Sequence, residues 1–329
     1  MRIVSATGDY FSELARSFGE GWNRFWFTPI DPLPLSVVRV GCGLVALYVV
    51  ATFSFDLDRL FGPDGMLPLD AVVKIQSMKE FTASPDTDPP NFRFSYLDYL
   101  TTSQGLWAGH MVGIAILTAF TLGLWTRLTS VAALVVFVSY IQRGPMLTWL
   151  VEPVIVFMLF YLCFGPSGAY LSIDSLLAKR RAAATAVPRR VPASWGANIA
   201  LRLIQIHICA VYVMMVLSKL FSDVWWNGEA MWFLAAKPES RLVDLTWLYQ
   251  HKYFFNIWTH SQVLYELTFP VLIWNRLARP LVIAAGVVLF TMLTLVTGAA
   301  SFGVAMLVGS LAFVPAAGLR KLAACFSRS

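Results

Sequence analysis

Lys219 combines a reactive side chain with an apolar context. It lies near the end of the 23-residue apolar run Ile199–Phe221, which is long enough to cross a bilayer. A lysine at that depth costs free energy, and such residues commonly mark functional sites. Burial favours the neutral amine, which can accept a proton as a general base. We therefore predict a site centred on Lys219 with base chemistry.

Two acidic residues are predicted at a comparable depth on other segments. Glu152 lies one turn into an apolar run and precedes Pro153, which weakens the helical hydrogen bonding there. Glu266 lies in a later apolar run, in the half that begins on the same side of the membrane. We predict that Glu152 or Glu266 accepts a proton beside Lys219. The competing interpretation is structural: the amine reaches the interface or forms an ion pair with one of these carboxylates, and pairing disfavours base chemistry.

One face of the helix predicted over 199–221 is polar. At 100° per residue, six positions fall within an arc of about 100°, namely Arg202, Gln205, Cys209, Tyr212, Val216 and Lys219. Tyr212 is predicted to donate a hydrogen bond about two turns deeper than Lys219. Trp225 and Trp226 follow the run and predict a return along the interface. The predicted binding residues are therefore Tyr212, Gln205, Trp225, Trp226 and Arg202.

Arg39 is a further charged residue within an apolar run, about six residues from its start. Two interpretations are open. Its side chain either extends to lipid phosphate at the interface or forms a structural ion pair, for which Glu152 is one candidate partner.

The composition predicts an integral membrane protein. Hydrophobic residues make up 57% of the chain and charged residues 13%, whereas soluble domains carry about 25% charge. The net charge of +6 does not indicate a nucleic-acid partner, because the basic residues fall between apolar runs, as membrane insertion requires. Four cysteines without metal-ligand or disulfide spacing predict neither a metal site nor a disulfide framework. The lipid bilayer is thus the first predicted partner.

We predict an all-α, polytopic transmembrane bundle of about eight spans, with seven to nine allowed by two short runs. The predicted spans are 33–54, 106–124, 128–141, 146–164, 199–221, 260–275, 279–297 and 302–315. Residues 1–30 are predicted as a cytoplasmic or interfacial amphipathic segment, 31–315 as the bundle, and 316–329 as a short basic cytoplasmic tail. The segment 165–198 is predicted as a loop.

The distribution of lysine and arginine predicts the orientation. With eight spans, the side that carries both termini holds 14 of these residues and the opposite side holds 8. The positive-inside rule then places both termini in the cytoplasm of a multi-pass protein of the cell membrane. Lys219 falls at the outer end of its span, close to the outer loops 55–105 and 222–259.

Three stretches of the sequence resemble the HTTM (horizontally transferred transmembrane) domain family. The first runs from Asp31 to Gly65 and includes Leu60-Phe61-Gly62-Pro63-Asp64-Gly65. The second runs from Leu122 to Asp174, and the third from Leu201 to Ala230 through Lys219-Leu220. The resemblance covers most of 31–315. The family is similar to the membrane part of vitamin K-dependent gamma-carboxylase.

The resemblance implies a role for the lysine and a cofactor. In the carboxylase, a lysine at the position resembling Lys219 deprotonates vitamin K hydroquinone, and the reactive oxygen species that results drives glutamate carboxylation. A quinone such as vitamin K is therefore the cofactor that the resemblance suggests. Short members of the family include a membrane component required to mature a secreted toxin peptide. This implies a secreted peptide or a partner membrane protein.

The sequence departs from the carboxylase in two respects. No large soluble portion follows the last predicted span, and 145–164 contains no histidine, so that Glu152 is its nearest ionisable residue. We therefore do not expect this chain alone to carboxylate glutamate. We keep three functions: a membrane enzyme or enzyme subunit that depends on a quinone or lipid and modifies a secreted peptide; a non-catalytic maturation or assembly factor; and, less favoured, a transporter.

Overall fold

The computed structural model describes residues 2–80, 94–147, 150–184, 191–237 and 242–326. Within these ranges the chain is helical, and strand pairing is limited to one isolated bridge between Ile30 and Ser194. The all-α prediction is confirmed. Long apolar runs form helices because the backbone groups of a segment surrounded by lipid must pair within that segment.

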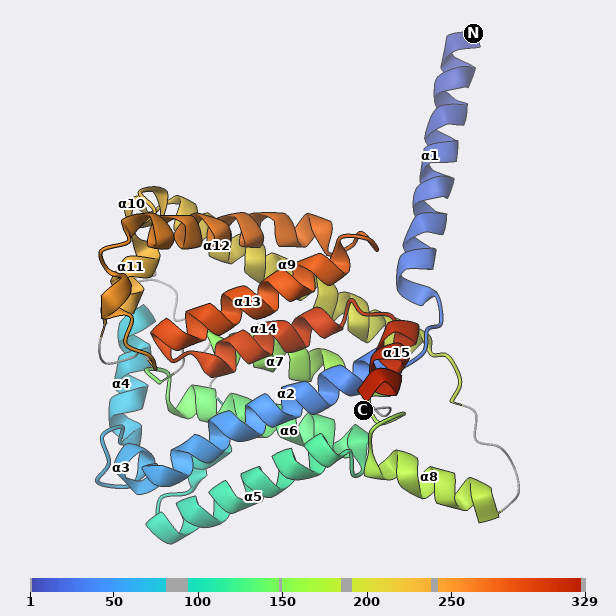
Figure 1. The fold of residues 1–329 in the computed structure, drawn as a ribbon. Coiled ribbons are helices and arrows are strands. Elements are labelled where there is room, and N and C mark those ends of the chain that lie inside the picture. Colours follow the sequence, from blue (N-terminus) through green and yellow to red (C-terminus); the bar gives the residue numbers. More distant parts are fainter. Residues whose placement is uncertain (1, 81–93, 148–149, 185–190, 238–241, 327–329) are drawn as a thin grey trace.

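The body of the molecule is a bundle of helices that lie side by side (Figure 1). They are α2 (Leu33–Thr52), α5 (Ser103–Leu122), α6 (Thr126–Arg143), α7 (Val151–Leu162), α9 (Trp195–Leu220), α12 (Lys252–Leu272), α13 (Arg279–Thr297) and α14 (Ala300–Leu311). Helix α2 packs against α5, α7 and α14, and α12 packs against α9. The side chains of Leu35, Val38 and Cys42 on α2 are fully buried in this core.

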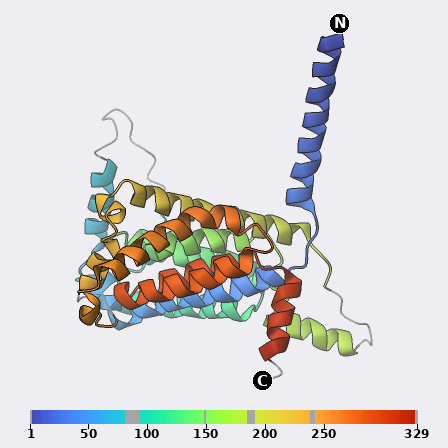
Figure 2. The same cartoon turned by 45° about the horizontal axis from the view of Figure 1, so that its top comes forward.

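Shorter elements lie at the two ends of the bundle (Figures 1 and 2). The end that we call the basic end carries α1 (Arg2–Phe27), α8 (Ile173–Ala184) and α15 (Ala316–Phe326). The opposite end, which we call the loop end, carries the following elements: α3 (Leu57–Phe61), α4 (Leu69–Glu80), α10 (Asp223–Trp226), α11 (Ala230–Ala236), and the 3₁₀ turns Phe53–Phe55, Tyr96–Tyr99 and Thr246–Leu248. Both termini therefore lie toward the same end.

Four helices of the described chain are long and apolar enough to cross a membrane, or five if the bent pair α14 and α15 counts as one span. The four are Leu33–Phe55, Ser103–Leu122, Trp195–Leu220 and Arg279–Thr297. Helix α7 is apolar but has only 12 residues. The predicted count of about eight spans is therefore not confirmed by length and composition.

Helix α1 has the apolar surface expected of an interfacial helix. It runs crosswise to the bundle helices in Figure 1. Phe11, Leu14, Phe18 and Trp22 recur at spacings of three or four residues and are each at least half exposed. A helix with such a stripe is suited to lie in the plane of a membrane surface.

Arg39 holds the basic end of the bundle together. Its side chain is fully buried. Nη1 donates to the carbonyl oxygens of Phe120 at 2.6 Å and Thr121 at 2.9 Å, Nε donates to Ser167 at 3.1 Å, and Nη2 donates to Leu171. The interpretation that Arg39 extends to the interface is wrong, because its side chain is fully buried. The carboxylate whose charge acts on Arg39 is Asp174 and not Glu152. The guanidinium instead donates to carbonyl groups at the end of α5 and in the segment after α7, where free carbonyls need partners. Of these, the Phe120 carbonyl also accepts from the Gly123 N–H at 3.0 Å.

The segment 165–198, predicted as a loop, contains α8, and an acidic residue of α8 fixes the start of α6. Asp174 Oδ1 accepts a hydrogen bond from the Trp125 backbone N–H at 2.9 Å. Asp174 Oδ2 accepts from the Thr126 backbone N–H at 2.8 Å and from the Thr126 hydroxyl, Oγ1, at 2.6 Å. Burial raises the pKa of the Asp174 carboxyl, but these hydrogen bonds and the charge of Arg39 outweigh it and hold the pKa below its ordinary value of 3.8. Asp174 thus caps α6 from another helix.

Replacing Asp174 with alanine is expected to lower the free energy of unfolding by about 1 kcal/mol at neutral pH, the usual size of a lost cap. A carboxyl whose pKa is depressed by folding stabilises above its ordinary pKa, and this stabilisation is lost as the pH falls through the folded value. The difference between wild type and Asp174→Ala should therefore shrink below pH 3.8. Thermal unfolding in detergent across a pH series measures it; a difference that grows with acidity would contradict the assignment.

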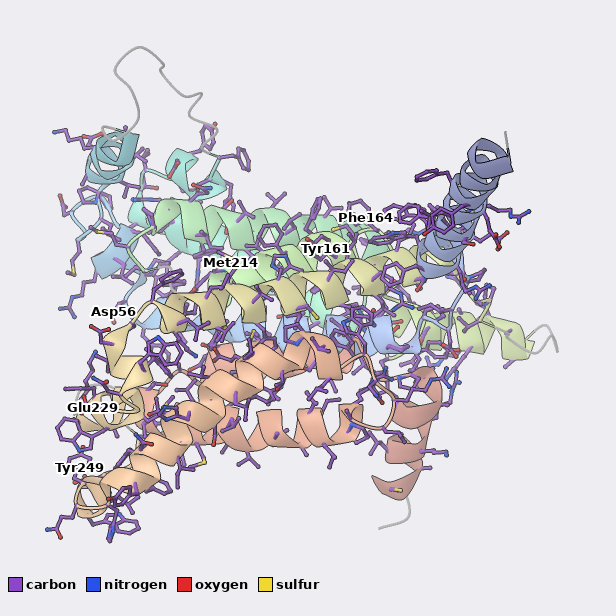
Figure 3. The ribbon with its side chains drawn as sticks, turned by 90° about the horizontal axis from the view of Figure 1, so that it is seen from above. Asp56, Tyr161, Phe164, Met214, Glu229 and Tyr249 are labelled. Carbon is purple, nitrogen blue, oxygen red and sulfur yellow. The ribbon has the colours of Figure 1, made fainter. Side chains whose placement is uncertain are left out.

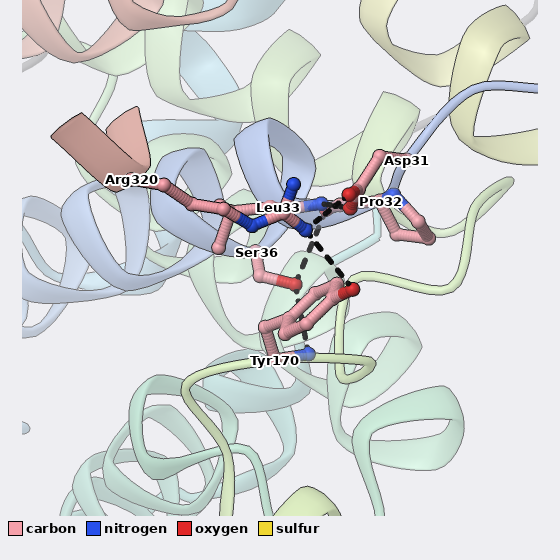
Figure 4. Close-up of polar contacts among 6 residues, drawn as sticks. All are labelled: Asp31, Pro32, Leu33, Ser36, Tyr170 and Arg320. Atoms are coloured by element: carbon pink, nitrogen blue, oxygen red, sulfur yellow. Dashed lines mark hydrogen bonds and ion pairs between the residues drawn. The ribbon is translucent and has the colours of Figure 1, made fainter. Parts of the chain in front are cut away.

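The C-terminal helix is fastened to the start of α2 (Figure 4). Arg320 of α15 forms an ion pair with Asp31, whose Oδ1 accepts from the Leu33 N–H at 3.0 Å. Ser36 Oγ accepts from the Tyr170 N–H at 3.2 Å. These contacts tie residues from three distant parts of the chain together at the basic end.

Candidate functional site

Lys219 lies in the last turn of α9, at the loop end, and its amine points toward α12. Lys219 Nζ donates to Glu266 Oε1, and the two side chains form an ion pair. The Glu266 side chain is fully buried and that of Lys219 is 14% exposed. Of the carboxylates predicted at this depth, Glu266 is thus the one in contact with the amine. A buried pair of this kind is electrostatically strong, because little water screens it.

Helix α12 presents a stripe of buried polar groups at successive i, i+4 positions, namely Trp258, Gln262 and Glu266. Gln262 Nε2 donates to Glu266 Oε1 at 2.9 Å. Within the described residues, three atoms of this stripe are buried without a hydrogen-bond partner: Trp258 Nε1, Gln262 Oε1 and Glu266 Oε2. Unpartnered buried polar atoms are rare in proteins, and here one donor and two acceptors are left available for a bound molecule or water.

Tyr212 lies deeper, below the ion pair, among aromatic side chains. It is fully buried, and its hydroxyl lies 3.4 Å from that of Tyr265, the neighbour of Glu266 in sequence. Its ring stacks on Phe269 with the centroids 3.9 Å apart. Gly286 on α13 leaves room for the Tyr265 hydroxyl, since a Cβ there would lie 2.3 Å from it. The floor of the site is therefore rigid and aromatic.

Helix α10 covers the ion pair at the loop end. The amine of Lys219 lies over the Trp225 ring, with Nζ 4.4 Å from the ring centroid, which is cation–π geometry. Trp226 turns outward: its side chain is 62% exposed and its Nε1 donates to the Leu220 carbonyl at 2.6 Å. Of the two tryptophans predicted for the site, Trp225 contacts Lys219 and Trp226 closes the end of α9.

A pocket of about 500 Å³ follows directly after α10 at the loop end. Its walls combine aromatic and polar side chains and are made by Asn227, Gly228, Glu229, Trp232, Phe233, Tyr253, Phe255 and Asn256. Phe255 precedes Gln262 by seven residues on α12, about 10 Å along the helix. Figure 3 shows Glu229 and Tyr249 at this end, with Asp56, while Met214 and Tyr161 lie along the bundle. The pocket lies at the same end of the bundle as the ion pair, and its lining does not include Lys219, Trp225, Gln262 or Glu266.

Three of the residues predicted for the site lie elsewhere. Arg202 precedes Lys219 by 17 residues, about 25 Å along α9. Its Nη1 donates to Gln205 Oε1 at 3.0 Å, and Gln205 Nε2 donates to the Ala312 carbonyl at 2.7 Å, both toward the basic end. Glu152, on α7, lines a separate small cavity with Phe53 and Tyr140.

Sequence reasoning missed two features of the loop end. The first is Gln262, which the i, i+4 spacing to Glu266 could have indicated. The second is the buried His110, whose Nδ1 lies 2.5 Å from the Tyr140 hydroxyl and whose Nε2 lies 2.8 Å from Ser54 Oγ. The apolar runs around His110 and Tyr140 carry no pattern that would pair them.

Comparison with known proteins gives one match. The family model described as HTTM domain matches residues 65–317, well over half of the chain and including every element of the site. No curated protein and no solved structure matches.

Proposed function

The chain belongs to the HTTM domain family, and from this premise we propose that it is a membrane enzyme or enzyme subunit whose site is the buried Lys219–Glu266 pair. The observation that carries the proposal is that a buried amine and a buried carboxylate touch each other while one carboxylate oxygen, Oε2, has no partner. A buried amine and carboxylate in contact, with an acceptor oxygen left free, can exchange a proton with a bound molecule.

The proposed topology follows from the two ends of the bundle. Helices α2, α5, α6, α7, α9, α12, α13 and α14 cross the bilayer, eight segments within the described chain, with the 12-residue helices α7 and α14 in a locally thinned region. The following basic residues lie on the elements of the basic end or at the helix ends beside them: Arg127, Lys179, Arg180, Arg181, Arg276, Arg279, Arg320 and Lys321. By the positive-inside rule the basic end and both termini are cytoplasmic, and the loop end is outside.

The pair can release a base without a change in net charge. Transfer of one proton from Lys219 Nζ to Glu266 Oε1 gives a neutral amine and a neutral carboxylic acid. Burial disfavours both charges of the ion pair, so this transfer costs far less free energy than it would in water. The neutral amine then takes a proton from a substrate O–H group and becomes an ammonium again. Gln262 and Trp225 hold the two partners in place.

The unpartnered atoms match a substrate that carries hydroxyl groups on an aromatic ring. Glu266 Oε2 and Gln262 Oε1 are acceptors, and a hydroquinone offers two donors. The aromatic side chains of the neighbouring pocket, Trp232, Phe233 and Tyr253, suit a flat, apolar ring. When bound, a hydroquinone such as that of vitamin K would supply the O–H proton that the neutral amine takes, and its anion would be formed at the loop end, where a secreted peptide would be modified.

A second function is favoured by the loop end itself. The pocket of Trp232, Phe233 and Tyr253 is aromatic and lies outside the bundle core, as in surfaces that hold a peptide or partner protein. A non-catalytic maturation or assembly factor would use this surface. Its action would then depend on the loops 55–105 and 222–259 and not on Lys219.

Retention of a quinone tests the proposal. Full-length protein extracted gently and examined by native mass spectrometry is expected to retain a quinone, with its hydroxyl groups on the orphan acceptors and the rest of the molecule extending to the pocket at the loop end. Asn256→Trp, which fills the pocket, should lower retention about tenfold. The matched control is Leu264→Trp on the outer face of the same helix, where the leucine is 60% exposed. Equal retention in both variants, or none in wild type even with added hydroquinone, would contradict the quinone assignment.

A further inference from the structure

A second cavity lies at the basic end, separated from the Lys219 site by the length of the bundle. It measures about 600 Å³ and lies between the start of α6, the segment after α7 and α8. Its lining comprises Trp125, Thr126, Arg127, Leu128, Ser130, Cys163, Gly165, Pro166, Ser167, Gly168, Ala169, Asp174, Leu177, Ala178 and Arg181. Neither the proposed chemistry nor the peptide surface uses it.

The charged groups of this cavity favour an anion. Arg127 on α6 and Arg181 on α8 are lining residues that carry positive charge on two different elements. Asp174 is the acid in the lining, and its carboxylate already accepts three hydrogen bonds from Trp125 and Thr126 at the start of α6. A phosphate group between two guanidinium groups would form charge-assisted hydrogen bonds.

The remaining walls favour an amphiphile over a free ion. Leu128, Cys163, Pro166 and Leu177 give the cavity an apolar side. A soluble phosphate would leave that side in contact with water, whereas an acyl chain would cover it. The neighbouring surface of α8 exposes Leu176 beside Lys179 and Arg180, a pattern suited to the level of lipid headgroups.

Trp125 in the cavity lining, and Leu171 shortly after the lining segment Gly165–Ala169, are held in an unusual backbone conformation. Trp125 (φ 46°) and Leu171 (φ 49°) are the non-glycine residues with positive φ within the described chain. Asp174 holds the Trp125 N–H, and Arg39 holds the Leu171 carbonyl. Such strain persists only where surrounding contacts enforce it, and it clusters at ligand sites. Trp125 is 71% exposed, so that its indole is available to the interface.

We propose that this cavity binds an anionic phospholipid of the leaflet at the basic end, with its phosphate between Arg127 and Arg181 and an acyl chain along Leu128, Cys163 and Leu177. The site is separate from the one at Lys219, so a result that contradicts one assignment leaves the other unaffected. Only the naming of the leaflet as cytoplasmic depends on the proposed topology.

The test is a titration of the full-length protein in detergent with phosphatidylglycerol, with bound lipid counted by native mass spectrometry. The double variant Arg127→Gln/Arg181→Gln is expected to weaken binding about tenfold, since each basic contact with an anionic lipid contributes appreciably. The double variant Lys179→Gln/Arg180→Gln removes the same charge from the same surface outside the cavity lining, and it should change binding by less than about twofold. Ala178→Trp fills the cavity without changing charge and should weaken binding as strongly as the arginine variant.

Three results would overturn the proposal. The first is an equal loss in the Lys179/Arg180 variant, which would mean attraction to the basic surface as a whole. The second is unchanged binding by Ala178→Trp. The third is displacement of the lipid by excess inorganic phosphate, which would mean a site for a soluble anion.

Discussion

Lys219→Arg is expected to lower the rate of vitamin K hydroquinone consumption by about 10²–10⁴-fold, the usual contribution of general base catalysis, while the protein remains folded. Arginine keeps a positive charge beside Glu266 and can form a bidentate pair with it. It cannot be deprotonated at accessible pH, so it cannot supply a neutral amine. The variant therefore separates base chemistry from a purely structural ion pair.

The measurements are hydroquinone consumption by purified protein in detergent and thermal unfolding of the same samples. Lys219→Ala is the less informative variant, because it leaves a fully buried carboxylate without its counter-ion, and removal of one partner of a buried pair costs about 3–5 kcal/mol of stability. The control is Lys219→Met combined with Glu266→Gln, which removes both charges and should fold but remain inactive. If Lys219→Arg kept more than a tenth of the wild-type rate, the amine would not be the base.

The contact between Lys219 and Glu266 could be predicted in part because depth in a membrane span follows from residue number. Each residue advances a helix by about 1.5 Å, so the ends of neighbouring antiparallel spans can be aligned from the sequence. What the sequence could not give was the choice between Glu152 and Glu266. Depth places both near Lys219, but only the packing of α12 against α9 decides which carboxylate meets the amine.

The polar arc on α9 shows a limit of helical periodicity. Arg202 and Gln205 share an angular range with Lys219, and the angle takes no account of distance along the axis. In the structure they contact each other and the Ala312 carbonyl, toward the basic end. Periodicity therefore identified the face that turns toward the bundle interior, whereas membership of one site also required position along the helix.

Arg39 shows a different limit. Its four acceptors belong to Phe120, Thr121, Ser167 and Leu171, which are 81 to 132 residues away in sequence. Backbone carbonyls carry no side-chain signature, so no pattern in the sequence marks them as partners of a guanidinium. Gly123 completes the arrangement: its φ of 71° ends α5, and a Cβ there would lie 2.7 Å from Arg39 Nη1.

Arg39→Leu is accordingly expected to be strongly destabilising, with a loss of about 3–5 kcal/mol in the free energy of unfolding. Leucine fills part of the volume but donates no hydrogen bond, and each buried carbonyl left without a partner costs about 1–3 kcal/mol. The loss falls short of the full sum because neighbouring groups and water would satisfy part of the carbonyls. Thermal or denaturant unfolding in detergent measures the effect.

Two matched variants serve as controls for this prediction. Arg39→Lys keeps the charge and up to three donors, but it lacks the planar fork that reaches α5 and the 167–171 segment together, so it should recover only part of the stability. Arg180→Leu removes an exposed arginine from α8 and should change stability by less than about 0.5 kcal/mol. If Arg39→Leu unfolded at the same temperature or denaturant concentration as wild type, the carbonyl groups would have other partners. Apolar packing alone would then hold α2, α5 and the segment after α7 together.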